Sequence, residues 1–358
     1  MCLLCSLLAC GTMHQAVRSP PDADFVLAGV SNVQRVCQLT GKESINKTDR
    51  FGVYGTDLGS MFEHRGRVFF LFGDTFGPRS DSQTGGGGQN WRCNTMAFTS
   101  DDNPSNGVLF DGMIVSADGM AKELITAKRI DKDEISAIPT YGVSANNAMY
   151  VFYMSVNHWG APGYWYCNFG GLARSTDDGQ TWQKLEELKW PGDGNFVQTA
   201  IARQDGQLWI WGIPGGRHGG VQLMRVAEAR IEDMRSYEYF AGMGEATAVW
   251  SRDMRKAVTI VEKPVGELSV VWNEYLQRWL MAYLNEQTHA IEMREGVSPW
   301  GPWSPPHRVC SAADYPALYG AYMHPRFLED GGRTVYFAMS QWLPYNVFWM
   351  KAVLQKID

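Results

Sequence analysis

Three carboxylates in this sequence have neighbours suited to cleaving a glycosidic bond. Asp57 lies in the segment Tyr54–Gly59 and Glu267 follows Gly266, so small neighbours leave room for a sugar beside each of them. Asp74 comes directly after an apolar run. Glycoside hydrolysis needs one protonated carboxyl group to donate to the leaving oxygen and one carboxylate as base or nucleophile. We expect Asp57 to be the base or nucleophile and Glu267 or Asp74 the general acid. A turn-capping role is the alternative for each acid, and it is strongest for Asp74.

Further polar and aromatic residues lie near the ends of strand-like segments, where loops could place them beside a bound sugar. Arg217 and His324 are candidate hydrogen-bond donors, and a purely structural role fits their positions equally well. Large aromatic faces are apolar platforms, and the tryptophans near loops are Trp91, Trp159, Trp165 and Trp342. The expected substrate-binding residues are Arg217, His324, Trp91, Tyr141 and Gln198.

Motifs of several other enzyme classes are absent from the sequence. It contains no Gly-x-Ser-x-Gly elbow, no His-Glu-x-x-His pair and no dinucleotide fingerprint. No two histidines have metal-ligand spacing and the cysteines beyond residue 10 form no CxxC pair, so we expect neither a metal site nor a cofactor. The Gly85–Gly88 run lacks the Gly-Lys-Ser/Thr that ends a phosphate loop. It is expected to be a surface loop, with a lid over the substrate as a second interpretation.

Composition favours an all-β protein with a neutral or weakly charged partner. The 358 residues include 14 Trp, 15 Tyr and 16 Phe, and the 38 Gly and 16 Pro supply frequent turns. That mixture is typical of many short strands. The formal net charge is −6 and no block of Lys or Arg occurs, so we exclude a nucleic-acid partner. A polysaccharide or oligosaccharide fits better.

The strand-like runs recur in pairs, and the pairs predict a β-propeller with five blades. In each pair a segment with polar residues precedes an uninterrupted apolar run, as expected if the first lines a central funnel and the second lies between blades. A strand near Phe25 would complete the last blade and close the ring, which removes exposed edges. One short helix is expected, around Ala227–Met234. The five pairs are 53–59 with 67–72, 138–143 with 148–153, 196–201 with 207–211, 266–271 with 278–283, and 318–324 with 334–339.

One blade carries a recognisable turn motif. The segment Ser175–Trp182 has the pattern Ser-x-Asp-x-Gly-x-Thr-Trp, which is called an Asp box. Its Asp and hydroxyl groups bond the backbone of a hairpin while the Trp packs beneath it. We therefore expect Asp177 and Asp178 to be structural, and we exclude them from catalysis.

The N-terminus resembles a lipoprotein signal. Leu7-Leu8-Ala9-Cys10 has the form of a lipobox, so we expect residues 1–10 to be a signal-like segment with Cys10 as the lipidated residue. Residues 11–24 would then be a linker, and residues 25–358 a single propeller domain. This predicts an exported, monomeric protein held at the cell envelope only through its lipid. A frayed apolar terminus is the alternative. Cys2 and Cys5 would leave with the signal-like segment, and the four cysteines beyond residue 10 are expected to be buried thiols or to form disulfides; they are Cys37, Cys93, Cys167 and Cys310.

Several of these segments together resemble a known bacterial family. Tyr54–Ser60, Phe72–Gly77, Gly266–Asn273 with Arg278-Trp279, and Trp300–Ser304 resemble a family described as a domain of unknown function (DUF4185). Some of its members are endo-D-arabinanases of glycoside hydrolase family 183. The resemblance covers the chain from about Phe51 onward. It implies a five-bladed propeller that hydrolyses internal D-arabinofuranosyl bonds, and it matches Asp57 and Asp74 to a pair of family aspartates and Glu267 to a family glutamate.

Two functions are consistent with these features. The first is a glycoside hydrolase acting on an arabinofuranose-containing glycan through two carboxylates. The second is a non-catalytic, lectin-like propeller that only binds glycan. A lectin propeller repeats one site in every blade, whereas the inner strands here differ from one another, which favours a single site and hence the enzyme.

Overall fold

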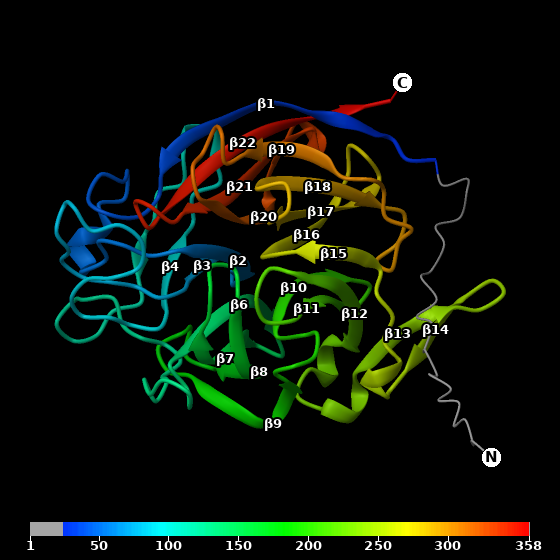
Figure 1. The fold of residues 1–358 in the computed structure, drawn as a ribbon, viewed down its shortest axis with the longest axis horizontal. Helices are drawn as coiled ribbons and strands as arrows, with labels where there is room; N and C mark the ends of the chain where they lie inside the picture. The colour runs from blue at the N-terminus through cyan, green and yellow to red at the C-terminus, as the bar shows by residue number, and fades with distance from the viewer. Residues whose placement is uncertain (1–23, 358) are drawn as a thin grey trace, which may run out of the picture.

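The computed structural model describes residues 24–357, and in them the chain forms five antiparallel sheets around a central axis (Figure 1). The predicted five-bladed all-β propeller is confirmed. In each blade the first strand of the sheet order lies nearest the axis. The proposed lipidation site Cys10, and the linker apart from its last residue, lie outside the described residues.

The blades follow one another along the chain, and the predicted strand pairs fall on the inner two strands of blades two to five. In blade one the second predicted segment, 67–72, is a strand, but the predicted inner segment 53–59 is misplaced, because the inner strand begins only at Leu58 and Asp57 precedes it. Blade one contains β2 (Leu58–His64), β3 (Arg67–Phe72), β4 (Thr95–Thr99) and β5 (Gly112–Met113). Blade two contains β6 (Ser136–Ala145), β7 (Ala148–Trp159), β8 (Trp165–Ser175) and β9 (Gln183–Pro191). Blade four contains β16 (Leu268–Asn273), β17 (Arg278–Asn285), β18 (Ala290–Gly296) and β19 (His307–Ser311).

Blade three is larger than the others. It contains β10 (Gln198–Gln204), β11 (Gln207–Ile213), β12 (Gly219–Ala227), β13 (Glu238–Met243) and β14 (Ala248–Ser251), and β15 (Val261–Val265) pairs with β12. The β13–β14 hairpin projects from the edge of the ring (Figure 1).

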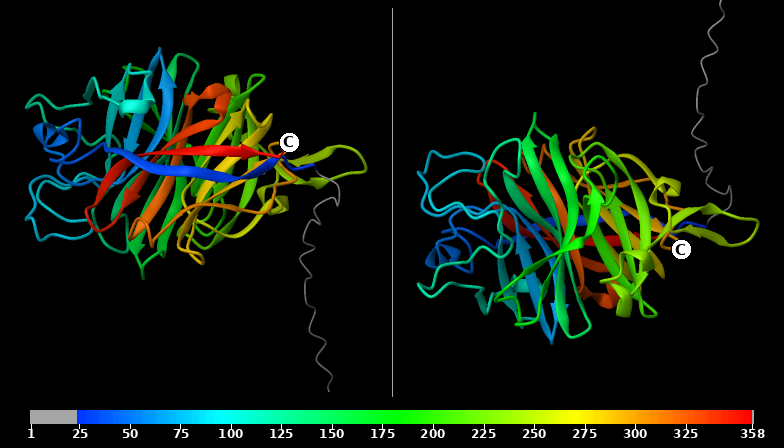
Figure 2. Two further views of the ribbon diagram at one scale, coloured as in Figure 1. Left: turned by 90° about the horizontal axis from the view of Figure 1, so that it is seen from above. Right: turned by 90° about the horizontal axis from the view of Figure 1, so that it is seen from below.

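Blade five closes the ring with strands from both ends of the described chain. Its order is β20 (Leu318–Glu329), β21 (Thr334–Gln341), β22 (Asn346–Lys356) and then β1 (Leu27–Gln38) on the outside. The first and last strands lie side by side in Figure 2. The buried carboxylate of Glu295, on β18, helps to hold the beginning of β1. Its Oε1 accepts from the backbone N–H groups of Val26 (2.5 Å) and Leu27 (2.7 Å).

The predicted helix around Ala227–Met234 is wrong. Strand β12 continues to Ala227, and the rest of the segment forms parts of two separate 3₁₀ turns. Glu228, Arg230, Glu232 and Asp233 leave that segment without a continuous apolar stripe to bury, so no longer helix is stabilised. Every helical element in residues 24–357 is a 3₁₀ turn, and none is long and apolar enough to cross a membrane. The turns are η1 (Thr48–Phe51), η2 (Pro104–Asn106), η3 (Glu228–Arg230), η4 (Met234–Ser236), η5 (Met254–Lys256) and η6 (Asp330–Gly332).

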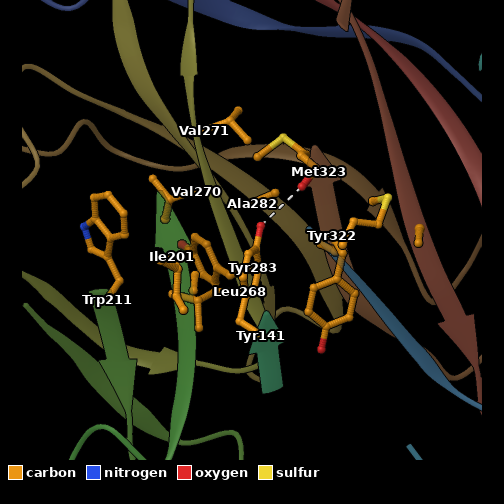
Figure 3. Packing of buried hydrophobic residues seen from close by; sticks show 14 of the residues in the cluster. Tyr141, Ile201, Trp211, Leu268, Val270, Val271, Ala282, Tyr283, Tyr322 and Met323 are labelled. Atoms are coloured by element: carbon orange, nitrogen blue, oxygen red, sulfur yellow. Dashed lines mark hydrogen bonds between the residues drawn. The ribbon is translucent and has the colours of Figure 1, made fainter. Parts of the chain in front are cut away.

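The hydrophobic core lies between neighbouring blades. The apolar second strands are buried almost throughout, as the sequence predicts, and their aromatic rings meet across blade boundaries. Trp211 of blade three packs on Trp279 of blade four with ring centroids 5.4 Å apart. Figure 3 shows part of this packing, with Ile201, Leu268 and Tyr283 side by side.

The Asp box is confirmed as a hairpin fastener. Asp177 accepts from the backbone N–H of Thr181 (2.8 Å) and from the hydroxyl groups of Thr181 and Ser175. The Trp182 indole N–H donates to the carbonyl of Gly179 at 3.0 Å. The four cysteines in the described region are free thiols, and no disulfide joins them.

Candidate active site

A pocket of about 780 Å³ opens at one end of the propeller axis, and all five blades contribute to its wall. The polar residues from the five blades include Asp57, Thr140, Gln198, Glu267 and Tyr319. Aromatic side chains form much of the remaining wall, and they include the four tryptophans named from the sequence. These aromatic residues are Phe76, Trp91, Trp159, Tyr164, Trp165, Tyr322, Trp342 and Tyr345.

The β2–β3 hairpin of blade one brings Asp57 and Asp74 to the same end of two paired strands. Leu58 pairs with Phe72, so Asp57 precedes β2 where Asp74 follows β3. Leu58 has a φ of 66°, and a bulge separates it from Ser60. A left-handed φ is uncommon for leucine, and it persists only when the surroundings enforce it. Here Ser340 accepts from the Leu58 N–H at 2.9 Å.

Asp57 lies where the ionised form of a carboxyl group is disfavoured. Burial, followed by the nearby charge of Asp74, raises its pKa from 3.8 to about 7, and Glu267 adds a smaller repulsion. Hydrogen bonding works in the opposite direction, because the Tyr319 hydroxyl donates to Asp57 Oδ2 at 2.9 Å and favours the carboxylate. Asp57 is therefore able to carry a proton close to neutral pH.

Asp74 is the more readily ionised of the two aspartates. Burial raises its pKa to about 6, and two hydrogen bonds limit the increase. Its Oδ1 accepts from the Ser136 hydroxyl and from the Trp91 indole N–H, both at 2.8 Å. The two carboxyl groups thus have different proton affinities, which is the condition for one to act as acid while the other acts as base.

Glu267 comes from blade four, directly before β16, and is bound to Arg217. Both Nε and Nη2 of Arg217 lie 2.9 Å from Glu267 Oε1. The other oxygen, Oε2, is buried and has no hydrogen-bond partner, and the side chain is only 5 % exposed. The carboxylate of Glu267 therefore presents less surface to a substrate than the partly exposed Asp57 and Asp74.

Residues 43–351 match the family described as Domain of unknown function (DUF4185). The chain belongs to this family. The family predicted from the motifs is thus confirmed across most of the chain. No curated protein matches the sequence.

Solved structures with a similar fold include proteins named for action on glycans. A Bacteroides ovatus protein described as a candidate hydrolase has a TM-score of 0.62 and 13% identity, with 94% of this chain and 97% of that chain covered. An exo-β-1,3-galactanase of Phanerochaete chrysosporium with bound β-1,3-galactotriose has a TM-score of 0.52 and 9% identity, covering 92% of this chain and 65% of that chain. A GH43_1 enzyme of Xanthomonas citri complexed with xylotriose has a TM-score of 0.50 and 11% identity, covering 90% of both chains. At these identities the likeness establishes the fold.

Most of the residues selected from the sequence line this one pocket. They are Asp57, Asp74, Glu267, Arg217, Trp91 and Gln198. The Gln198 amide N–H group donates to the carbonyls of Pro214 (2.9 Å) and Gly216 (2.7 Å), so it holds the loop that carries Arg217. Gly86 and Gly87 also line the pocket, so the glycine run lies at its edge.

Tyr141 and His324 lie outside the pocket, in the interior. Tyr141 is 4 % exposed, and its hydroxyl donates to the carbonyl of Met323 at 3.4 Å (Figure 3). His324 is 8 % exposed, accepts from the backbone N–H of Arg326, and has its pKa lowered by burial to about 4. We therefore leave both residues out of the proposed binding set.

Sequence reasoning missed three residues that shape the site. Tyr319 and Ser136 hydrogen-bond the two aspartates, and Glu286 binds Arg217 Nη1 at 3.0 Å. Tyr319 lies in the predicted inner segment 318–324, so its place on a pocket-lining strand could have been predicted from the sequence. Glu286 and Ser136 are a turn residue and a strand-end residue without any motif. Among residues 24–357, no group of three or more His, Cys, Asp or Glu side chains is arranged to hold a metal ion.

Proposed function

We propose that this protein is a glycoside hydrolase in which Asp57 and Asp74 are the catalytic pair. The observation that carries the proposal is the aspartate pair itself: two carboxyl groups at one end of a hairpin, with pKa values raised to about 7 and about 6, beside an aromatic-lined pocket. A carboxyl pair with separated proton affinities matches the requirement of glycosidic cleavage.

In this proposal Asp57 donates its proton to the leaving glycosidic oxygen as the bond from the anomeric carbon breaks. Asp74 is ionised, and it either deprotonates the attacking water or attacks the anomeric carbon itself. These roles differ from the sequence-based expectation, which made Asp57 the base or nucleophile. The reason is that Asp57 has the higher pKa and Asp74 accepts two hydrogen bonds that favour its carboxylate.

Glu267 then serves as a positioning residue. Its carboxylate is engaged by Arg217 and largely buried, so we assign it the role of fixing that guanidinium beside Tyr319. The ring of Tyr319 lies 4.6 Å from the Arg217 guanidinium carbon, and its hydroxyl reaches Asp57.

The proposed substrate is a D-arabinan-type glycan cut at internal arabinofuranosyl linkages. Support comes from the segments around Asp57, Asp74 and Glu267, which resemble those of the DUF4185 family, some of whose members are endo-D-arabinanases. The names of the similar galactanase and GH43_1 structures support a glycan more generally. Trp159 and Trp342 are 44 % and 48 % exposed at the pocket and supply apolar faces for sugar rings.

The test is hydrolysis of a panel containing D-arabinan, L-arabinan, xylan and β-1,3-galactan, with products sized by chromatography. We expect oligosaccharides from D-arabinan. Asp57→Asn and Asp74→Asn should each lower kcat by about 10²- to 10⁴-fold, as expected for loss of general acid or base catalysis. Asp102→Asn, which changes an exposed carboxylate outside the pocket, is the matched control and should retain full activity.

Two results would redirect the proposal. Full activity in both Asp57→Asn and Asp74→Asn would refute the assignment of Asp57 and Asp74 as the catalytic pair. Calorimetric binding of D-arabinan without release of reducing ends would support the lectin-like alternative.

We further propose, from the lipobox in the sequence, that the protein is exported and anchored through Cys10 as a monomer. Labelling with a radioactive fatty acid during expression should mark the wild type and leave Cys10→Ala unmarked. Light scattering of the released 25–358 domain should give the mass of one chain.

A further inference from the structure

The pocket has one guanidinium, and its place is fixed from several sides. Within the described region, Arg217 is the only Arg or Lys that lines the pocket, and His289 is the only His. The Arg217 backbone N–H donates to the carbonyl of Gly163 at 3.0 Å. The guanidinium lies between the rings of Tyr319 and Trp165, at 4.6 and 5.6 Å from their centroids. The backbone hydrogen bond and the two ring contacts therefore fix the position of Arg217.

The positive charge of Arg217 is balanced by two carboxylates. Glu267 Oε1 lies 2.9 Å from both Nε and Nη2, and Glu286 Oε1 lies 3.0 Å from Nη1. Glu286 Oε2 also lies 3.8 Å from Nδ1 of His289, an exposed side chain. Glu267 is the more buried partner at 5 % exposure, whereas the Glu286 side chain is 21 % exposed.

The charges that surround a bound ligand are consequently negative in sum. Asp57 and Asp74 add two more carboxyl groups, so four acids face one guanidinium. A carboxylate on a sugar would enter this low-dielectric pocket without a free cation to pair with, which is unfavourable. Hydroxyl groups of a neutral sugar carry no such cost, and they can donate to the same oxygens.

We propose that Glu286 masks Arg217 and thereby makes the pocket select uncharged glycans against carboxylated ones. This inference rests on the proposed glycan-cleaving function and adds to it the charge class of the substrate. Glu286 acts here as a specificity-determining residue, because it occupies Nη1 of the guanidinium and is the more exposed of the two carboxylates that bind Arg217.

The experiment compares two derivatives of the same D-arabinan oligosaccharides, one O-hydroxyethylated and one O-carboxymethylated to the same degree. They are similar in size and differ in charge. Binding is measured by tryptophan fluorescence at pH 7, and kcat/KM by reducing-end release. We expect the wild type to bind the neutral derivative more tightly by on the order of tenfold or more at low salt. In 1 M salt, where the Debye length is about 3 Å, the preference should shrink.

Glu286→Gln keeps a hydrogen-bond acceptor for Arg217 and removes one negative charge. It should raise the ratio of carboxymethyl-derivative affinity to neutral-derivative affinity on the order of tenfold relative to the wild type. Glu187→Gln removes an exposed carboxylate from outer strand β9 and is the matched control. It should leave unchanged the ratio of the two derivatives' affinities and the ratio of their kcat/KM values. Adding Arg217→Met to Glu286→Gln should abolish the gain.

The outcomes separate this inference from the proposed function. If the derivatives are bound with the expected preference but none is cleaved, the charge selectivity stands and the hydrolase proposal falls. If cleavage occurs but Glu286→Gln leaves the binding ratio unchanged, the role of Glu286 is wrong. Equal binding of both derivatives by the wild type, or binding of neither, overturns the inference.

Discussion

Replacing Tyr319 by phenylalanine should shift the pH dependence of catalysis to higher pH. If Asp57 must be protonated and Asp74 ionised, kcat/KM follows a bell-shaped curve, with an acid limb near pH 6 and a basic limb near pH 7. The Tyr319 hydroxyl donates to Asp57 Oδ2 and favours the carboxylate. Removing it therefore makes Asp57 hold its proton to higher pH, so the basic limb moves upward.

The size of this shift follows from the strength of the lost hydrogen bond. A hydrogen bond to a charged group contributes about 1.5–3 kcal/mol, and one pKa unit corresponds to about 1.4 kcal/mol. Because the site opens to water, we take the lower end and expect the pKa of Asp57 to rise by about 1. The basic limb would move from about pH 7 to about pH 8, and the acid limb would stay within about 0.3 because Asp74 does not contact Tyr319.

The assay measures kcat/KM from pH 4 to pH 10 with the glycan that the wild type cleaves. Tyr322→Phe is the matched control, since Tyr322 also lines the pocket but makes no hydrogen bond to either aspartate. In Tyr319→Phe the phenylalanine ring keeps the contact that the tyrosine ring makes with Arg217. A thermal melt of each variant checks that it is folded. A basic limb that stays in place or moves downward in Tyr319→Phe would refute the assignment of Asp57 as the acid.

Three stability predictions complete the set. Because the pKa of Asp57 is raised from 3.8 to about 7, the native state holds a proton that the unfolded chain has released between those pH values, so its destabilising effect grows as pH rises. Asp57→Asn should therefore raise the free energy of unfolding by about 1–2 kcal/mol at pH 8 and by much less at pH 4 in urea titrations; equal gains at both would contradict this. Asp177→Ala should cost about 1–2 kcal/mol with activity unchanged, since it loses the Thr181 hydrogen bonds of a hairpin remote from the pocket; lost activity in the folded variant would argue against a purely structural Asp box. Glu295→Ala should cost about 2–4 kcal/mol and speed hydrogen exchange in β1, because two backbone N–H groups lose a buried acceptor; unchanged exchange there would show that β1 does not need this contact.

The architecture was predictable from sequence because its signals are local. Strand pairs repeat, each with a polar inner segment and an apolar second segment, and the run at 67–72 became β3 without adjustment. Closing the ring with the strand near Phe25 followed from the need to cover a sheet edge, and β1 pairs with β22 accordingly. The candidate acids were also visible locally, since Asp57 and Asp74 are 17 positions apart on one hairpin.

The positions of Tyr141 and His324 outside the pocket have identifiable physical causes. A register shift between Pro139 and Tyr141 disturbs the alternation on which an inward-facing assignment depends. His324 lies five residues beyond Tyr319 in β20, which at roughly 3.3 Å per residue carries it about 16 Å along the strand, away from the pocket mouth.

By itself, the sequence determined the five-bladed all-β ring, the Asp-box fastener and the set of acids from which the site is made. Only the tertiary structure shows how the burial and the bonding partners of these acids differ. Burial and neighbouring charge raise the pKa of Asp57, hydrogen bonds from Trp91 and Ser136 favour ionised Asp74, and Arg217 engages Glu267. These effects depend on distances between side chains from different blades, and no local pattern of residues encodes such distances.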